Sequence, residues 1–294
     1  MSANPHTLGP ALMALSMALY VANDATVKFL GSSVGDTLGG SLPLGAIIVW
    51  RGVFIITLLL VLILLLPGHG PRALRWTLRK PVLIRSAWDA AVTFCYLAAL
   101  MHMPLANILA IMNLSPLLIL PLAAWRLGEP LRAADMLAVL AGLIGAWLVV
   151  RPGPEGFNAF ALLALAAATA AALRDISTRH IPADAPTLSV TLSNMLLVQA
   201  GGLLLWLTHP ALPASTAQWG LLALAAMLLG GAIATLIASV RIAPLRISAP
   251  WRYSIIIWGV LAGWLVFGHV PDAFTMLGIG IILASSLHAT LRRA

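Results

Sequence analysis

The sequence predicts an all-α polytopic membrane protein with ten transmembrane helices, arranged as two inverted five-helix repeats. Three observations lead to this fold class: an apolar composition, ten apolar runs that fill the chain, and an internal repeat. Of the 294 residues, 61% are hydrophobic and 9% are charged, and the mean hydropathy is +0.99. Soluble domains carry about 25% charged residues, so this composition does not cover a surface that faces water.

The apolar runs are separated by Pro, Gly and charged residues, and each has the length of one membrane crossing. About 20 apolar residues in a helix span the hydrocarbon core of a bilayer. Ten such helices use nearly the whole chain and leave no room for a soluble catalytic domain. The predicted spans cover residues 8–30, 43–66, 82–101, 104–126, 132–150, 157–178, 186–207, 217–240, 244–267 and 272–290.

Lys and Arg in the short loops predict how these spans are oriented. Cytoplasmic loops carry an excess of both residues, and a cytoplasmic N-terminus places 13 of the 17 on the inside. We therefore predict a multi-pass protein of the inner cell membrane with both termini in the cytoplasm. The pI near 11.0 follows from these loops. The expected partner is thus the lipid bilayer, and nucleic acid is not expected.

An internal repeat relates the two halves of the chain. Residues 100–128 align with residues 240–268 without a gap, which places Asn113 opposite Tyr253. Earlier in each half, the pattern Asp-x-x-x-Lys/Arg ends both the first and the sixth predicted spans. The two predicted repeats are residues 1–151 and 152–294.

Five spans is an odd number, so consecutive copies of the repeat lie in opposite orientations. The count of basic residues in the loops independently requires this inversion. Inverted repeats are typical of transporters, whose two halves exchange conformations around a site near the middle of the membrane. Gene duplication in a channel or in a membrane enzyme is the alternative.

Several segments together resemble the drug/metabolite transporter superfamily in its EamA-type ten-helix form. They are Trp50-Arg51, the run from Asn113-Leu-Ser-Pro116 to Gly128-Glu-Pro130, Gly142-x-x-Gly145, and the segment from Ala243-Pro244 to Tyr253 with its Phe267-Gly-His ending. One departure is His269, where such proteins usually repeat the glutamate found at Glu129. The resemblance implies a carrier without ATP hydrolysis, with a central cavity between the halves. It also implies an export role, with amino acids, including aromatic ones, as the closest branch.

Polar residues on the first predicted span form the first candidate site. Ionisable groups at membrane depth are costly, so they face a partner or a wet cavity. Tyr20, Asn23 and Asp24 share a helical face at spacings of three and four. Asp24 and Lys28 are also four residues apart, so the alternative is a pair of charges that neutralise each other.

The third predicted span carries Asp89 and Tyr96 on one face. Asp89 has no basic partner close by on this face, and Arg51, near the middle of the second span, is the expected partner across the bundle. This pair is either a structural tie or part of a proton or substrate site. The residues alone leave both interpretations open.

The ninth predicted span carries two tryptophans, Trp251 and Trp258, that lie too deep to anchor at the membrane surface. They predict either an aromatic wall of a cavity or large residues filling a helix contact. Arg252 beside them has the geometry to hold a carboxylate with two hydrogen bonds. The predicted substrate-binding residues are therefore Tyr20, Asn23, Asp24, Asp89, Tyr96, Asn113, Trp251, Arg252, Tyr253 and Trp258.

Prolines and small residues predict the moving and the packed parts of the bundle. Pro104 and Pro244 open the fourth and ninth spans on opposite sides of the membrane, so the hairpins before them are candidates for two alternating gates. The simpler alternative is that proline suits a helix start. Small residues predict close helix packing at Ala141 and Gly145, Gly259 and Gly263, Gly278 and Gly280, with a hinge at Gly230-Gly231. A homodimer through the fifth and tenth spans stays open.

Together these features predict a secondary-active transporter that exports small metabolites, above all amino acids, by alternating access around a central cavity. The alternatives are a membrane channel, or an intramembrane enzyme that acts on an apolar substrate. No catalytic or nucleotide-binding motif occurs, so an enzyme is not expected. The single cysteine, Cys95, and seven scattered histidines predict neither a metal site nor a cofactor.

Overall fold

The computed structural model describes residues 5–32, 40–65, 74–127, 133–150, 159–182, 184–243 and 245–293. Within these residues the chain is helical and contains no strand. The predicted boundary between the repeats at 151/152, Glu129 and Pro244 lie outside the described residues.

Each predicted span coincides with one helix or with a run of short helices, and the ends differ by only a few residues. The first half contains α1 (Pro5–Gly31), α2 (Leu44–Leu65), η2 (Arg75–Leu78), α4 (Lys80–His102), α5 (Leu105–Met112), α6 (Ser115–Leu127) and α7 (Ala133–Val150). The second half contains α8 (Ala159–Thr178), α9 (Thr187–Thr208), α10 (Thr216–Ile242), α11 (Leu245–Ser248), η3 (Ala249–Tyr253), α12 (Ser254–Phe267) and α13 (Ala273–Arg293).

Seven helical segments in the described part of the chain are long and apolar enough to cross a membrane. The helices α7 and α13 contain shorter apolar stretches, and α1 is helical over the whole first predicted span. The all-helical, many-span architecture is therefore confirmed. The full count of ten spans and the inversion of the two halves stay predictions.

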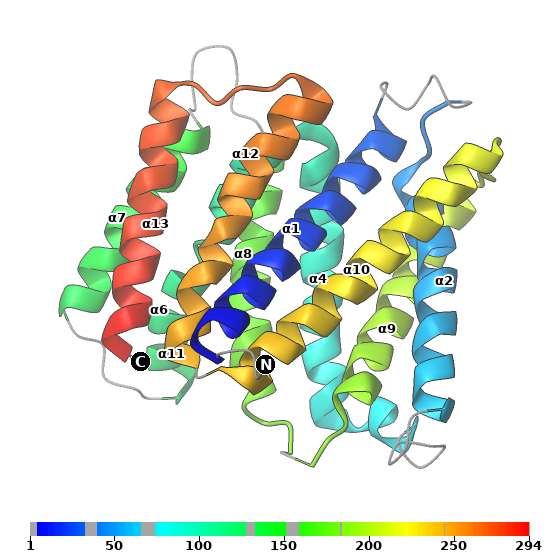
Figure 1. Cartoon of the computed structure of the whole chain (residues 1–294), viewed down its shortest axis with the longest axis horizontal. Helices are drawn as coiled ribbons and strands as arrows, with labels where there is room; N and C mark the ends of the chain where they lie inside the picture. The colour runs from blue at the N-terminus through cyan, green and yellow to red at the C-terminus, as the bar shows by residue number, and fades with distance from the viewer. Residues whose placement is uncertain are drawn as a thin grey trace.

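Helices from the two halves pack against each other in pairs. The most extensive contacts join α1 to α10, α4 to α8, α7 to α13 and α2 to α9. In Figure 1, α7 and α13 stand at one edge of the bundle, α2 and α9 stand at the other, and α1 runs beside α10 between them. Both ends of the chain lie at the same end of the bundle (Figure 1).

The fourth and ninth predicted spans are each interrupted near the middle. The fourth breaks between α5 and α6 around Asn113, and η3 lies between α11 and α12 in the ninth. Pro116 has no N–H, so the carbonyl four residues earlier loses its helical partner. The Asn113 side chain donates to the Leu109 carbonyl at 2.7 Å, and Ser286 of α13 donates to the Asn113 carbonyl at 2.8 Å. Asn113 therefore stabilises a kink and ties it to α13.

Two glycines let the backbones of α7 and α13 approach each other closely. A Cβ atom on Gly278 would lie 2.6 Å from the Gly145 carbonyl oxygen, and one on Gly145 would lie 2.8 Å from that of Gly278. The predicted packing role is correct for these two residues. It is wrong for Gly280, where an added Cβ would meet nothing within 4 Å. These glycines serve contacts within the chain, and a homodimer through this pair of helices stays a prediction.

Gly278→Ala is expected to lower the free energy of unfolding by about 1–3 kcal/mol, because the methyl group overlaps the backbone of α7. Gly280→Ala, two residues along the same helix, is the matched control. It is expected to be neutral or to stabilise the protein by up to about 1 kcal/mol, since alanine favours helix. Thermal unfolding of both purified variants in detergent compares them. Equal midpoints would show that the α7–α13 contact does not require Gly278.

Candidate functional site

Four residues of α1, α2 and α4 form a buried polar group, which we call the deep cluster: Asn23, Asp24, Arg51 and Tyr96. The Tyr96 hydroxyl donates to Asp24 Oδ2 at 2.6 Å, and Asn23 Nδ2 donates to Asp24 Oδ1 at 2.9 Å. Arg51 Nη1 donates to Asn23 Oδ1 at 3.2 Å. The Asn23 amide thus bridges the carboxylate of α1 and the guanidinium of α2.

The deep cluster holds opposite charges away from water. Asn23 is 3% exposed, Asp24 is 9% exposed and Arg51 is 7% exposed. Buried charges are tolerated only when they are paired and hydrogen-bonded, and the hydrogen bonds from Tyr96 and Asn23 meet that need for Asp24. Among the described residues, Arg51 Nε has no hydrogen-bond partner. The cluster therefore keeps one charged N–H group that no protein acceptor uses.

Lys28 does not neutralise Asp24, so the structure rules against the alternative of a self-neutralising pair on α1. Its Nζ atom donates to the carbonyl oxygens of Leu100 at 2.6 Å and of Met103 at 2.5 Å. Carbonyls at the C-terminal end of a helix lack helical partners and carry partial negative charge. The end of α4 therefore satisfies the ammonium, while Tyr96 and Asn23 satisfy Asp24.

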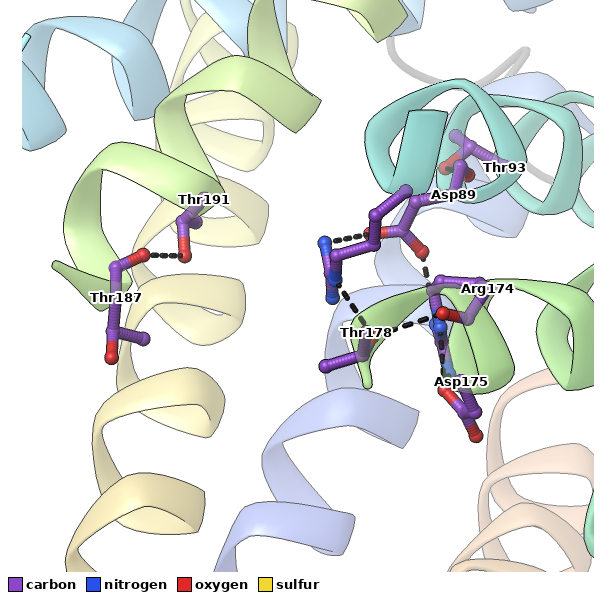
Figure 2. Close-up of polar contacts among 8 residues, drawn as sticks. Asp89, Thr93, Arg174, Asp175, Thr178, Thr187 and Thr191 are labelled. Atoms are coloured by element: carbon purple, nitrogen blue, oxygen red, sulfur yellow. Dashed lines mark hydrogen bonds and ion pairs between the residues drawn. The ribbon is translucent and has the colours of Figure 1, made fainter. Parts of the chain in front are cut away.

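Ion pairs join α4 to α8, and we call them the α4–α8 network. Arg174 Nη1 lies 2.9 Å from Asp89 Oδ1, Arg174 Nη2 lies 2.9 Å from Asp175 Oδ1, and Arg85 Nη1 lies 3.4 Å from Asp89 Oδ2. Figure 2 shows Asp89 directed at Arg174, with the α9 residues Thr187 and Thr191 across from the pair.

The predicted pairing of Arg51 with Asp89 is also wrong. Asp89 precedes Tyr96 by seven residues, which is about 10 Å along α4. Arg51 lies with Tyr96 in the deep cluster, whereas the cations that reach Asp89 are Arg174 on α8 and Arg85 on α4. The prediction pairs these two charges, whereas the structure places them in two separate groups.

The prediction that Asp89 has no basic partner close by is wrong, since Arg85 lies four residues earlier on α4 and its Nη1 atom is 3.4 Å from Asp89 Oδ2. Sequence reasoning also omitted Arg174 and Asp175 from the site. The internal repeat could have identified Arg174 and Asp175, because the pattern Asp-x-x-x-Lys/Arg ends both the first and the sixth predicted spans. At an offset of 151 it aligns Asn23-Asp24 with Arg174-Asp175. The first pair lies in the deep cluster and the second in the α4–α8 network. Both pairs meet α4, one at Tyr96 and the other at Asp89.

Tyr20 lies on the same face of α1 as Asp24. It precedes Asp24 by four residues, so it sits about one helical turn away on the same face of α1. Its hydroxyl is in the electrostatic field of Asp24 from the deep cluster, of Asp89 and Arg174 from the α4–α8 network, and of Arg252. The sequence predicts that Tyr20 shares this face with Asn23 and Asp24, and its role in binding a substrate stays a prediction.

The remaining predicted site residues lie in the interrupted fourth and ninth spans. Trp251 is 49% exposed and Trp258 is 37% exposed. Arg252 is also exposed, and Tyr253 is half-buried. The structure brings none of them into the hydrogen bonds described for the two polar groups. Their role as an aromatic and polar wall stays a prediction.

A pocket of about 250 Å³ lies apart from the predicted site residues. It is formed where α4 begins and where α6 and α8 end, and it is lined by Pro81, Ile84, Arg126, Ile176, Ser177 and His180.

In the described ranges no group of three or more His, Cys, Asp and Glu side chains is placed to hold a metal ion.

Comparison with known proteins relates this chain to transporters. Residues 9–151 match the EamA-like transporter family. The chain is 28% identical to the pseudopaline exporter of Pseudomonas aeruginosa over 209 residues, which is 70% of this chain and 73% of the exporter. It is 25% identical to a riboflavin transporter of Brucella anthropi over 281 residues, which is 94% of this chain and 96% of that protein.

A solved crystal structure shares the fold. The alignment covers 97% of this chain and 98% of the chain in that structure, with a TM-score of 0.63. The two sequences are 20% identical. At that identity the likeness concerns the fold alone. The family match, the named relatives and the apolar helices together support a multi-pass membrane transporter.

Proposed function

We propose that this chain, whose first half matches the EamA-like transporter family, is a secondary-active exporter of small metabolites that works by alternating access. The observation that carries the proposal is the deep cluster, a buried group of opposite charges between helices that are long and apolar. Such groups in membrane proteins mark the paths of solutes and ions. The α4–α8 network and Tyr20 extend this polar region along the bundle.

The packing of the helices supports two exchangeable halves. By the order of spans in the two predicted repeats, α1 corresponds to α8, α2 to α9, α4 to α10 and α7 to α13. Exchanging each helix with its counterpart turns the α1–α10 contact into the α8–α4 contact. The same exchange leaves the α2–α9 and α7–α13 contacts unchanged. The interruptions of the fourth and ninth spans also fall at aligned positions, since Asn113 is aligned with Tyr253. Interrupted helices at matching positions are a pointer to a transport site.

The basic residues of the loops favour an orientation in the inner membrane in which both chain termini are cytoplasmic. The end of the bundle at which the termini lie then faces the cytoplasm. On this assignment the α4–α8 network lies in the inner half of the membrane, since Arg85 follows the start of α4 and Arg174 is near the end of α8. Lys28 and the end of α4 then lie at the outer side. A solute leaving the cell meets the network first and the deep cluster second.

The charges at the site favour a zwitterionic solute such as an amino acid or a related metabolite. Carboxylate groups are bound by guanidinium N–H donors, and Arg51 Nε offers one inside the deep cluster. Asp24 and Asp89 offer negative charge for an ammonium group. The relatives include a pseudopaline exporter and a riboflavin transporter, so larger polar metabolites belong in the same test.

Uptake into proteoliposomes tests the function. The solutes are a panel of amino acids and riboflavin, each with and without a pH gradient. An exporter is expected to give saturable flux for a subset of the panel. Flux that rises linearly with concentration favours the channel, and no flux of any solute favours the enzyme alternative. Protein-free liposomes are the control for leakage.

Tyr96→Phe is expected to lower the transport rate about tenfold, because it removes a hydrogen bond to a carboxylate and little else. Asp24 Oδ2 then loses its bond to α4. The measurement is initial flux at saturating solute, compared with Gly280→Ala as a folded control. A wild-type rate for Tyr96→Phe would remove the deep cluster from the transport path.

A further inference from the structure

Lys28 is a buried cation, and within the part of the chain that the structure describes no carboxylate is bonded to its ammonium. Its side chain is 5% exposed, and both hydrogen bonds of its Nζ atom go to backbone carbonyls, those of Leu100 and Met103. The same ammonium lies 5.6 Å from the centre of the Phe267 ring, at the end of α12. One ammonium therefore joins the ends of three helices: α1, α4 and α12.

The carbonyls that Lys28 holds belong to the hairpin between α4 and α5. The helix α4 ends at His102, and Pro104 is the residue before α5. The His102 ring stacks on Phe160 of α8, with centroids 3.7 Å apart and an angle of 2° between the planes. The hairpin is thus held from one side by α1 and α12 and from another by α8.

We propose that the Lys28 ammonium is the latch that keeps this hairpin closed over the outer end of the transport path. The inference rests on the proposed function for the path and its orientation. Opening the hairpin breaks two charge-assisted hydrogen bonds and the contact with the Phe267 ring at once. Lys28 touches no solute in this role; it is a positioning residue for the gate.

Asp24 supplies a second partner for the released ammonium. It lies four residues earlier on α1, at the spacing that allows a pair on one helical face. In the present structure Tyr96 and Asn23 occupy both of its carboxylate oxygens. A solute that displaces Tyr96 or Asn23 frees Asp24 for Lys28. Occupation of the deep cluster then favours release of the latch.

A thiol-labelling experiment tests the latch without any transport measurement. Cys95 is the single cysteine of the chain, so Cys95→Ser removes the background. Met103→Cys then reports on the hairpin, since the Met103 side chain is only 4% exposed. The measured quantity is the labelling rate of this cysteine by a membrane-impermeant maleimide in intact cells. Labelling is compared with and without Lys28→Met.

Lys28→Met is expected to raise the labelling rate by about tenfold or more, as the loss of a hydrogen bond to a charged group implies. Lys80→Met is the matched control, because Lys80 is the other lysine of the chain and is exposed at the start of α4. It is expected to leave labelling unchanged. An equal rate for Lys28→Met and its parent would overturn the latch.

A second reporter separates opening from unfolding. Ala226→Cys lies 3% exposed in an apolar cluster with Ile55 and Leu192. It is expected to stay protected in the Lys28→Met protein. Labelling of Ala226→Cys would indicate that Lys28→Met unfolds the protein. The Met103→Cys experiment is then repeated with Phe267→Leu in place of Lys28→Met, because this variant removes the contact between the ring and the ammonium and keeps an apolar side chain. No increase in Met103→Cys labelling by Phe267→Leu then overturns the latch.

The latch and the proposed function fail in different ways. Faster labelling in Lys28→Met, together with no saturable flux of any solute, keeps the gate and overturns the transport proposal. Saturable flux with unchanged labelling keeps the transporter and overturns the latch. A slower rate of export in Lys28→Met with faster labelling is the result that the two proposals predict together.

Discussion

Asp24→Asn is expected to abolish transport and to lower the free energy of unfolding by about 3 kcal/mol. Removing one member of a buried charge pair leaves the other uncompensated, and the desolvated charge accounts for most of the cost. Here the charge left behind is Arg51, which is 7% exposed and in the electrostatic field of Asp24. The measurements are flux in proteoliposomes and unfolding by denaturant in detergent.

The double variant Asp24→Asn with Arg51→Met separates stability from function. It removes both charges, so its stability is expected to return to near that of the wild type. Transport is expected to stay lost, because the carboxylate that Tyr96 and Asn23 hold is the group proposed to meet the solute. Recovery of flux in the double variant would reduce the deep cluster to a structural tie.

A double-mutant cycle on Asp89 and Arg174 is expected to show a coupling free energy of about 0.5–3 kcal/mol, the range for residues in one ion-pair network. The two side chains are 14% and 24% exposed, and their charged atoms lie 2.9 Å apart. The variants are Asp89→Asn, Arg174→Gln and the combination of both. The free energy of unfolding is measured for each.

The matched control is the same cycle on Asp89 and Arg51. These residues belong to different groups, so their coupling is expected to stay below about 0.5 kcal/mol. The side-chain chemistry is the same in both cycles, and only the three-dimensional arrangement differs. Equal coupling in the two cycles would contradict the separation of the α4–α8 network from the deep cluster.

The helical architecture was predictable from the sequence because the bilayer acts on the chain segment by segment. Backbone groups in hydrocarbon must be satisfied within each helix, so the length of each apolar run predicts the helix almost to the residue. The run from Leu44 to Leu65 was predicted as residues 43–66 and the run from Thr187 to Thr208 as residues 186–207. These predictions needed no knowledge of neighbouring helices.

Part of the candidate site was equally predictable. The polar face with Tyr20, Asn23 and Asp24 follows from helical periodicity alone, and the structure places Asn23 and Asp24 together in the deep cluster. The kink at Asn113 was not foreseen, although Pro116 nearby carried the signal. The substrate-binding role of this residue stays a prediction; in the structure its side chain donates to the Leu109 carbonyl of its own helix.

Only the tertiary structure decided which groups pair. Along the sequence, Lys28 had one obvious partner four residues away, and the competing partners are main-chain carbonyls 72 and 75 positions further on. A carbonyl is present at every residue, so no sequence pattern distinguishes those that a helix end leaves unpaired. Asp89 likewise found Arg174 because α4 packs along α8.

The sequence by itself therefore determined that this is a helical membrane protein, where its helices run and which polar residues lie within them. The tertiary structure decided that those residues form the deep cluster and the α4–α8 network, and that Lys28 binds the carbonyls at the end of α4. The physical reason is the separation along the chain of the residues on which each effect depends. Burial in lipid depends on the composition of one segment, whereas a hydrogen bond or an ion pair depends on contact across a few ångströms between segments far apart in the chain.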